Sequence, residues 1–219
     1  MPGVIVAVFY LIVIVLGILS MGFQLLGSRL LNPHFGSSII VWAWLISTFL
    51  AAFSLGSLLG GWISSLPAPR RFRLQLAAAT GAVLTLAFTA ALGRGVLDAI
   101  EIRFENVSTA LLVSCLGLFF VPVTMLSCFG PQCVQFLAAR GTKPGAASGV
   151  IYGISTVGNI AGVMLTAFVL LPNIKVSSLL YVWLGVAITA LAGLLTLLRR
   201  AEAGNAAPAA ASSPVTPPR

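Results

Sequence analysis

One stretch of the chain, residues 145–172, places polar side chains along a single face of a predicted membrane helix. An α-helix turns about 100° per residue, so residues three and four apart share one side. The polar members of this stretch follow that spacing and form one narrow stripe: Ser148, Tyr152, Ser155, Asn159, Gly162 and Thr166. The hydroxyl and amide groups on this stripe donate and accept hydrogen bonds, and that is the chemistry they offer to a polar molecule.

The opposite side of the same stretch is apolar. It carries Val150, Ile154, Val157, Ala161, Met164 and Phe168. An amide such as that of Asn159 is costly in hydrocarbon unless it is hydrogen-bonded. We therefore expect the polar stripe to face other helices or a water-filled cavity, and the apolar side to face lipid.

Two ionisable side chains near the end of the first apolar run are further candidates. Arginine at membrane depth usually has a function, but near a helix end it can also extend to the headgroups, and both interpretations apply to Arg29. His34 follows an Asn-Pro pair and could titrate near neutral pH, or it could simply cap or pack in a loop.

The sequence lacks the residue sets from which most active sites are built. It contains no GxGxxG fingerprint, no Walker loop and no Ser/His/Asp set on a soluble segment, and no Asp or Glu falls inside an apolar run. Cys115, Cys128 and Cys133 form no CxxC pair, so we interpret them as small buried residues. We predict that the protein is not an enzyme and uses no metal and no other cofactor.

The composition predicts that membrane helices position these residues. The chain is 59% hydrophobic and 7% charged, whereas soluble domains carry roughly 25% charged residues. Six apolar runs reach the length of about 20 residues that a membrane span requires: 4–26, 38–64, 74–93, 108–129, 145–171 and 177–198. We predict an all-α integral membrane domain over residues 1–200 and a disordered tail rich in Ala, Pro and Ser over residues 201–219.

The positive charges predict the orientation. Seven of them follow the second, fourth and sixth runs: Arg70, Arg71, Arg73, Arg140, Lys143, Arg199 and Arg200. The positive-inside rule places these ends in the cytoplasm, together with both termini. The formal net charge of +8 is thereby explained by helix orientation, and we predict no binding to nucleic acid.

Two further patterns concern local structure. Between the third and fourth runs, Leu97, Ile100 and Phe104 recur at helical spacing, which favours a short interfacial helix, although alternation at Ile102 leaves a strand open. Pro122 within the fourth run and Pro131 directly after it predict a kinked or interrupted helix, because proline removes a backbone donor. Broken helices form substrate sites in transporters, but packing and an exit turn are the alternative.

Glycines spaced by four allow helices to approach closely in a membrane. They occur in the second run at Gly56 and Gly60, and in the fifth run at Gly149, Gly153, Gly158 and Gly162. Packing within one chain accounts for such a pattern, and a homodimer contact remains open for some of these glycines.

Four segments, in this order along the chain, carry a resemblance to a known family. They are FQLLGSRLLNPHFGSSIIVWAW, LAAFSLGSLLGGW, VPVTMLSCFGPQCVQFLA and GVIYGISTVGNIAGVMLTAFVLLP. Together they resemble the membrane domain of spermidine synthase-like bacterial membrane proteins, over roughly residues 16–186. The resemblance implies a six-helix unit related to half of a major facilitator transporter, with a 3+3 inverted repeat in a bacterial inner membrane. Its members often carry a soluble aminopropyltransferase-like domain, which this sequence does not contain.

By this analogy, Gln24, Arg29 and residues 122–132 meet the polar stripe. The implied function is a small-molecule transporter-like unit, acting as a dimer, with a central site of Gln24, Arg29, Tyr152, Ser155 and Asn159. Arg29 would hold an anionic group, and Tyr152 would offer a stacking face. The alternative is a noncatalytic anchor or accessory subunit for a soluble aminopropyltransferase-like enzyme or a larger membrane complex.

Overall fold

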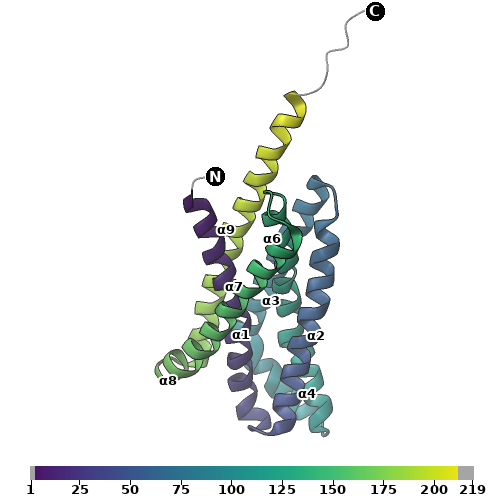
Figure 1. Cartoon of the computed structure of the whole chain (residues 1–219). Coiled ribbons are helices and arrows are strands. Elements are labelled where there is room, and N and C mark those ends of the chain that lie inside the picture. Colours follow the sequence, from purple (N-terminus) through teal and green to yellow (C-terminus); the bar gives the residue numbers. More distant parts are fainter. Residues whose placement is uncertain (1–2, 212–219) are drawn as a thin grey trace, which may run out of the picture.

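The computed structural model describes the backbone of residues 3–211 and the side chains of residues 4–200. Within this range helices joined by short loops make up the chain, and there is no strand. Six stretches are long and apolar enough to cross a membrane: Val4–Phe35, Ile39–Ser64, Ala68–Arg103, Val107–Ala138, Pro144–Asn173 and Val176–Arg200. The prediction of an all-α chain with six membrane-length helices is therefore confirmed (Figure 1).

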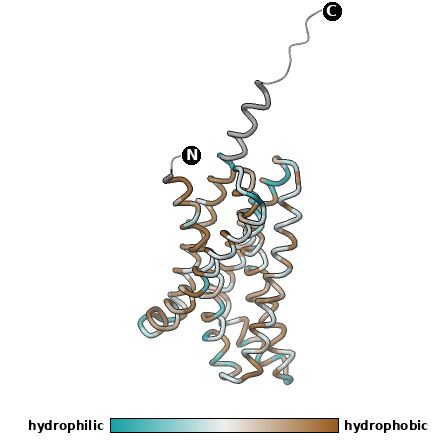
Figure 2. Tube along the Cα trace, viewed as in Figure 1, coloured by the Kyte–Doolittle hydropathy of each residue, from teal (hydrophilic) through white to brown (hydrophobic). Residues whose placement is uncertain are grey.

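Three spans are single helices, and the last span begins a helix that continues beyond it. These are α1 (Gly3–Phe35), α2 (Ile39–Ser64), α3 (Ala68–Arg103) and α9 (Val176–Ala211). The fourth span consists of α4 (Val107–Cys115), η1 (Leu116–Phe120), α5 (Val121–Ser127) and α6 (Phe129–Ala138), and the fifth of α7 (Pro144–Met164), η2 (Leu165–Leu170) and α8 (Leu171–Asn173). Hydrophobic residues follow the bodies of the helices, and many hydrophilic residues gather at their ends (Figure 2).

Local signals explain several helix ends. Helix α1 ends before Gly36, whose φ of 71° suits the left-handed conformation that closes many helices. Ser38 then caps α2 by accepting a hydrogen bond from the Val41 amide. Asn106 caps α4 in the same way, because its side-chain oxygen accepts from the amides of Ser108 and Thr109.

Residues 97–103 are helical, as their spacing predicts, but they do not form the expected separate interfacial helix, and the strand alternative is wrong. Helix α3 instead continues without interruption to Arg103. No proline interrupts this stretch, and Leu97 and Ile100 keep the spacing of the buried face and are buried with it. The first break is Phe104, whose backbone is extended.

Each of the two π-helical segments ends two residues before a proline. Segment η1 ends at Phe120, before Pro122, and η2 ends at Leu170, before Pro172. Proline lacks the N–H that would bond the carbonyl four residues earlier. For Pro122 that carbonyl belongs to Leu118, and the Thr89 hydroxyl of α3 donates a hydrogen bond to it at 2.8 Å. A hydrogen bond between two spans thus reaches the carbonyl that residue 122 would bond in a regular α-helix.

The spans pack in a fixed set of pairs. Helix α1 contacts α7 most extensively and also α9, α2 contacts α5 and α6, and α3 contacts α9 and α5. A Cβ atom at Gly158 or Gly162 would stand closer than 3.0 Å to backbone atoms of Ile14 or Ile18 in α1. These two glycines therefore serve packing within the chain. No described atom lies within 4 Å of the Cβ position at Gly149 or Gly153.

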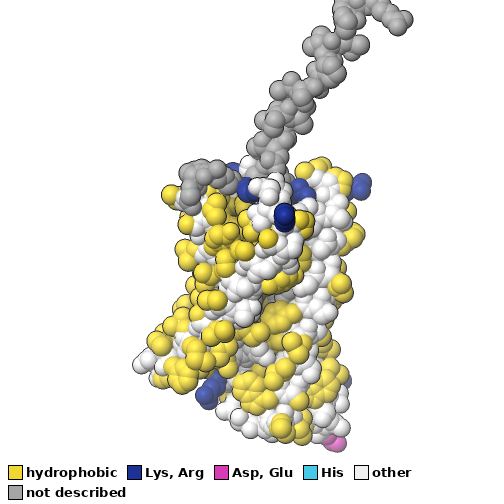
Figure 3. Space-filling view, in the orientation of Figure 1, with side chains coloured by type: hydrophobic (Ala, Val, Ile, Leu, Met, Phe, Trp, Pro, Cys, Tyr) yellow, Lys and Arg dark blue, Asp and Glu magenta, His cyan; other side chains and the backbone are white. Residues whose placement is uncertain are grey.

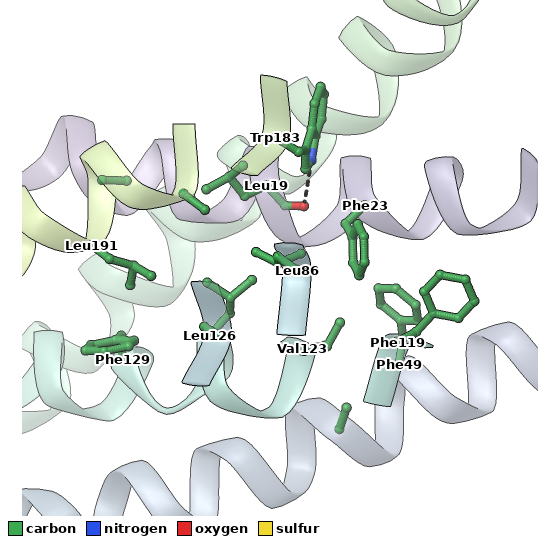
Figure 4. Packing of buried hydrophobic residues seen from close by; sticks show 14 of the residues in the cluster. Leu19, Phe23, Phe49, Leu86, Phe119, Val123, Leu126, Phe129, Trp183 and Leu191 are labelled. Atoms are coloured by element: carbon green, nitrogen blue, oxygen red, sulfur yellow. Dashed lines mark hydrogen bonds between the residues drawn. The ribbon is translucent and has the colours of Figure 1, made fainter. Parts of the chain in front are cut away.

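The buried core joins the same helices. Its centre contains Phe23, Phe49 and Phe119, with centroids of Phe23 and Phe119 5.7 Å apart. Beside them, Trp183 of α9 donates a hydrogen bond from Nε1 to the carbonyl oxygen of Leu19 at 3.1 Å (Figure 4). This bond satisfies the buried indole and fixes α9 against α1.

Among the residues whose side chains are described, the acids lie at one end of the bundle and most of the cations at the other. Helix α1 begins and α9 ends at the same end, and the loops after α2 and α6 lie there too (Figure 1). Most Lys and Arg side chains visible in Figure 3 lie at this end, and an acidic side chain is visible at the other. We call them the basic end and the acidic end. Helix α9 extends to Ala211, and residues 212–219 lie outside the described residues, so the disordered tail stays a prediction.

Candidate functional site

A cavity of about 230 Å³ lies between α1, α2, α5, α6 and α7. Its walls are mixed. Val13, Leu16, Met21, Phe53, Leu126, Gly130, Cys133 and Ile151 supply the apolar part, and Ser20, Ser57, Ser127, Tyr152, Ser155 and Asn159 supply the polar part. We call this space the central cavity. The close-up of the core shows Leu126 of its lining beside the packed residues Phe129 and Val123 (Figure 4).

The polar groups of the central cavity are hydroxyls and one amide. No Asp, Glu, Lys, Arg or His from the described residues lines it. The hydroxyls of Ser20 and Ser127 donate to the carbonyls of Leu16 and Val123 in their own helices, which leaves their oxygen lone pairs free to accept. Among the described residues, the side chains of Ser155 and Asn159 have no hydrogen-bond partner. They can therefore donate to and accept from a bound solute.

The α1–α7 contact positions these two side chains. A Cβ atom at Gly17 would lie 2.5 Å from the backbone carbonyl oxygen of Ser155 and 3.0 Å from the backbone nitrogen of Asn159. The backbone of α7 therefore lies directly on α1 at this level, and the side chains of Ser155 and Asn159 extend from the edge of the contact into the central cavity. Helix α7 presents much of its other side to the surroundings, where Val157 is 60% and Ile160 58% exposed.

Aromatic rings lie beyond the cavity toward each end. Toward the basic end, Phe9 of α1 and Phe136 of α6 stack with centroids 4.5 Å apart. Arg140 covers the Phe136 ring at 3.5 Å from its centroid, and its Nη1 donates to the Phe136 carbonyl. Partial burial here lowers the pKa of Arg140 from its ordinary value, but an arginine remains protonated. Toward the acidic end, Phe49 packs between Phe53 and Phe119.

The structure brings together three of the five predicted binding residues. Tyr152, Ser155 and Asn159 line the central cavity, and Tyr152 is 51% exposed at its edge. Arg29 does not line it, because it lies 12 residues beyond Gly17 on α1, or about 18 Å along the helix. Arg29 lines two other cavities at the acidic end. Gln24 is half-buried on α1 and lines none of the cavities described here.

The two prolines predicted to break the fourth span lie outside or beside the cavity. Pro122 is buried in α5 and follows η1. Pro131 adjoins the cavity-lining Gly130, after the turn at Cys128 that separates α5 from α6. Its missing N–H leaves the Ser127 carbonyl without a helical donor, at a residue that lines the cavity.

Sequence reasoning did not single out the serines that face the polar stripe, although the segment 122–132, which the resemblance brings to the stripe, contains Ser127. Ser20, Ser57 and Ser127 belong to no polar stripe as long as that of residues 148–166, so their spacing does not single them out. The available signal was indirect. Ser57 follows Gly56, and a Cβ at Gly56 would strike the Thr124 carbonyl, so the same close approach of α2 to α5 brings Ser57 to the cavity.

The comparisons with known proteins do not add an assignment to this geometry. The chain matches no protein-family model, no curated protein and no solved structure. What the chain can bind is therefore argued from the cavity and its neighbours alone.

Proposed function

We propose that the chain is a small-molecule transporter-like membrane unit whose central cavity binds an uncharged solute through hydrogen bonds. The observation that carries the proposal is the lining itself, with the free groups of Ser155 and Asn159 opposite serine hydroxyls and no ionised side chain. An ion in such a cavity would lose its hydration without gaining a counter-charge. At about 230 Å³, the cavity is below the range of about 300–1,000 Å³ common for drug-sized ligands, which favours a small solute.

This proposal changes the role expected of Arg29. An anionic group held by Arg29 and an amide contact to Asn159 cannot belong to one small solute, because the two side chains line different cavities. The solute of the central cavity is accordingly neutral, and Tyr152 supplies a ring and a hydroxyl at its rim.

The packing pattern supports a 3+3 inverted repeat. The most extensive contacts between spans join the first with the fifth, the second with the fourth, the first with the sixth, the third with the fourth, and the third with the sixth. Exchanging the first span with the fourth, the second with the fifth and the third with the sixth gives the same set of pairs again. Such a repeat is common in secondary transporters, whose substrate sites lie near the membrane midplane between repeats.

The charge separation supports the orientation. We place the basic end, with both described ends of the chain, in the cytoplasm of a bacterial cell whose inner membrane the six helices span. The acidic end, with Asp98, Glu101 and Glu105, then faces outward.

A second candidate is an anchor or accessory subunit that packs against a partner. The observation in its favour is the exposed face of α7, where the positions of Gly145, Gly149 and Gly153 have open space above them. Membrane helices approach closely at such faces. A second copy of the chain would make the transporter a dimer, and an aminopropyltransferase-like enzyme or another membrane protein would make it an accessory subunit.

Flux into liposomes tests the proposal. The purified full chain is reconstituted, and the entry of a panel of small polyols, amides and charged solutes is measured. We expect entry of one or more uncharged solutes, reduced about three- to tenfold by Asn159→Ala, as for the loss of one hydrogen bond. Asn173→Ala is the matched control, because the Asn173 side chain is exposed and hydrogen-bonds only within the fifth span. Absence of flux for the whole panel, with a stoichiometric foreign partner after gentle extraction, would favour the accessory role.

A further inference from the structure

A second polar cavity, unrelated to the central cavity, lies at the acidic end. It measures about 270 Å³ and is formed by the end of α1, the last turns of α3 and the beginning of α9. Arg29 and Arg94 line it from two different helices, together with His34 and Asp98. The adjoining cavity of about 200 Å³ shares Leu30 and Arg94 with it.

The charges in this cavity are not balanced. The Nδ1 atom of His34 lies 2.9 Å from a Glu101 carboxylate oxygen and 3.6 Å from one of Asp98, so the nearby acids gather around the histidine. Neither Arg29 nor Arg94 forms an ion pair with any residue in the described part of the chain. Among the lining residues, two guanidinium groups face one carboxylate, that of Asp98. The other nearby acid, Glu101, does not line the cavity and is hydrogen-bonded to His34.

The depth of the two arginines corresponds to the headgroup region. Arg29 lies six residues before the end of α1 and Arg94 nine residues before the end of α3, or about 9 Å and 13 Å along the helix axes. Helix α3 is about 54 Å long, whereas a hydrocarbon core is about 30 Å thick. The helix therefore extends about 12 Å beyond the hydrocarbon core at each end if it is centred in the bilayer. Residues about 12 Å from an end then lie at the border of the core, close to the lipid phosphates.

The adjoining cavity gives this site a partly apolar extension, which Thr89 and Ser177 also line. It continues from Arg94 and Leu30 past Ala90, Leu180 and Tyr181. These residues of α3 and α9 lie about one turn closer to the middle of the bundle than Arg94 and Val176 do. A free phosphate ion would fill only the charged part, whereas a lipid would also place an acyl chain along the extension.

We propose that the cavity between Arg29 and Arg94 binds a phospholipid with a net negative headgroup. The phosphodiester lies between the two guanidinium groups, which hydrogen-bond to phosphate oxygens in a charge-assisted way. The free N–H groups at the start of α9, near Val176, add a positive dipole end to the same site. An acyl chain follows the groove between α3 and α9.

Native mass spectrometry of the full chain in detergent tests this site, with phosphatidylglycerol, phosphatidylethanolamine and inorganic phosphate as the three probes. We expect phosphatidylglycerol to bind most tightly, and Arg29→Gln or Arg94→Gln to weaken it about five- to tenfold. Arg103→Gln is the control, because Arg103 is an exposed cation near the same end that lines neither cavity. Ala91→Trp, which fills the apolar extension, should weaken the lipid and leave inorganic phosphate unaffected.

Three results would overturn the inference. Equal loss with Arg103→Gln would show general surface attraction, and equal binding of phosphatidylethanolamine would remove the charge preference. Binding of inorganic phosphate as tight as that of the lipid would identify a site for free phosphate. Thermal unfolding of each variant shows whether the variant is folded, which separates these results from misfolding. Arg29→Lys, which keeps the positive charge, should bind more lipid than Arg29→Gln. Solute flux through the central cavity is a separate readout, because that cavity shares no lining residue with this site.

Discussion

A side chain at Gly17 would collide with the backbone of Ser155, because a Cβ at Gly17 would lie 2.5 Å from the Ser155 carbonyl oxygen. This contact sets the distance between α1 and α7 at the level of the central cavity. The positions of Ser155 and Asn159 therefore depend on the absence of a side chain on the facing helix.

The first prediction concerns Gly17→Ala. The added methyl group must push α7 away from α1, which we expect to destabilise the protein by about 1–3 kcal/mol and to weaken solute binding. Thermal unfolding in detergent measures the first effect, and flux in liposomes the second. Gly61→Ala is the control, because Gly61 has open space above it and should change neither. Unaltered stability and flux in Gly17→Ala would mean that the α1–α7 contact does not position the site.

The second prediction concerns Thr89→Val. Its hydroxyl donates to the Leu118 carbonyl that Pro122 leaves without a helical partner, and a buried unsatisfied group costs about 1–3 kcal/mol. We expect a loss of stability in that range, measured by thermal or denaturant unfolding. Thr85→Val, which removes bonds only within its own helix, should cost less.

A double-mutant cycle makes the same prediction sharper. Pro122→Ala restores the N–H that can reach Leu118, so Thr89→Val should cost less in that background than in the natural chain. Equal costs in both backgrounds would mean that the hydroxyl does not substitute for the bond that proline removes.

The third prediction concerns the rings toward the basic end. Phe136→Leu removes the stack on Phe9 and the surface that Arg140 covers. We expect faster modification of Cys133, which lines the central cavity, by a water-soluble thiol reagent added to the basic side. Peptide mass spectrometry distinguishes Cys133 from the other two cysteines. Phe72→Leu, near Arg199, is the control. An unchanged rate would mean that these rings do not limit access.

The fourth prediction concerns Trp183→Phe. This change keeps most of the packing but removes the hydrogen bond to the Leu19 carbonyl. The expected cost is about 1 kcal/mol, read as a lower unfolding temperature. Trp62→Phe, at a site that is 57% exposed, should have almost no effect. Equal changes in unfolding temperature for Trp183→Phe and Trp62→Phe would show that the indole hydrogen bond does not contribute to stability.

The sequence alone predicted the six spans and the sidedness of α7. Membrane helices can be recognised by length and hydrophobicity alone, because the backbone polar groups are hydrogen-bonded within each helix and do not depend on neighbouring helices. The stripe of Tyr152, Ser155 and Asn159 was visible for a similar reason, since a helix fixes which residues share a face.

The interruptions of the fourth and fifth spans were only partly predictable. Pro122 and Pro131 pointed to the fourth span, but the π-segment before Pro172 was not expected. A proline shows which carbonyl loses its partner. It does not show whether the helix changes to a π-helix, ends in a turn, or accepts a hydrogen bond from a side chain of another span, as Leu118 does from Thr89.

Only the tertiary structure decided what faces the stripe. Ser20, Ser57 and Ser127 meet it because glycine contacts bring α1 close to α7 and α2 close to α5. The periodicity of a single span does not show which other spans it packs against. The same arrangement separated Arg29 from Asn159. Helical spacing fixes a residue's direction around its own axis, but its height relative to a residue on another helix follows from the packing, and that height determined which side chains share a cavity.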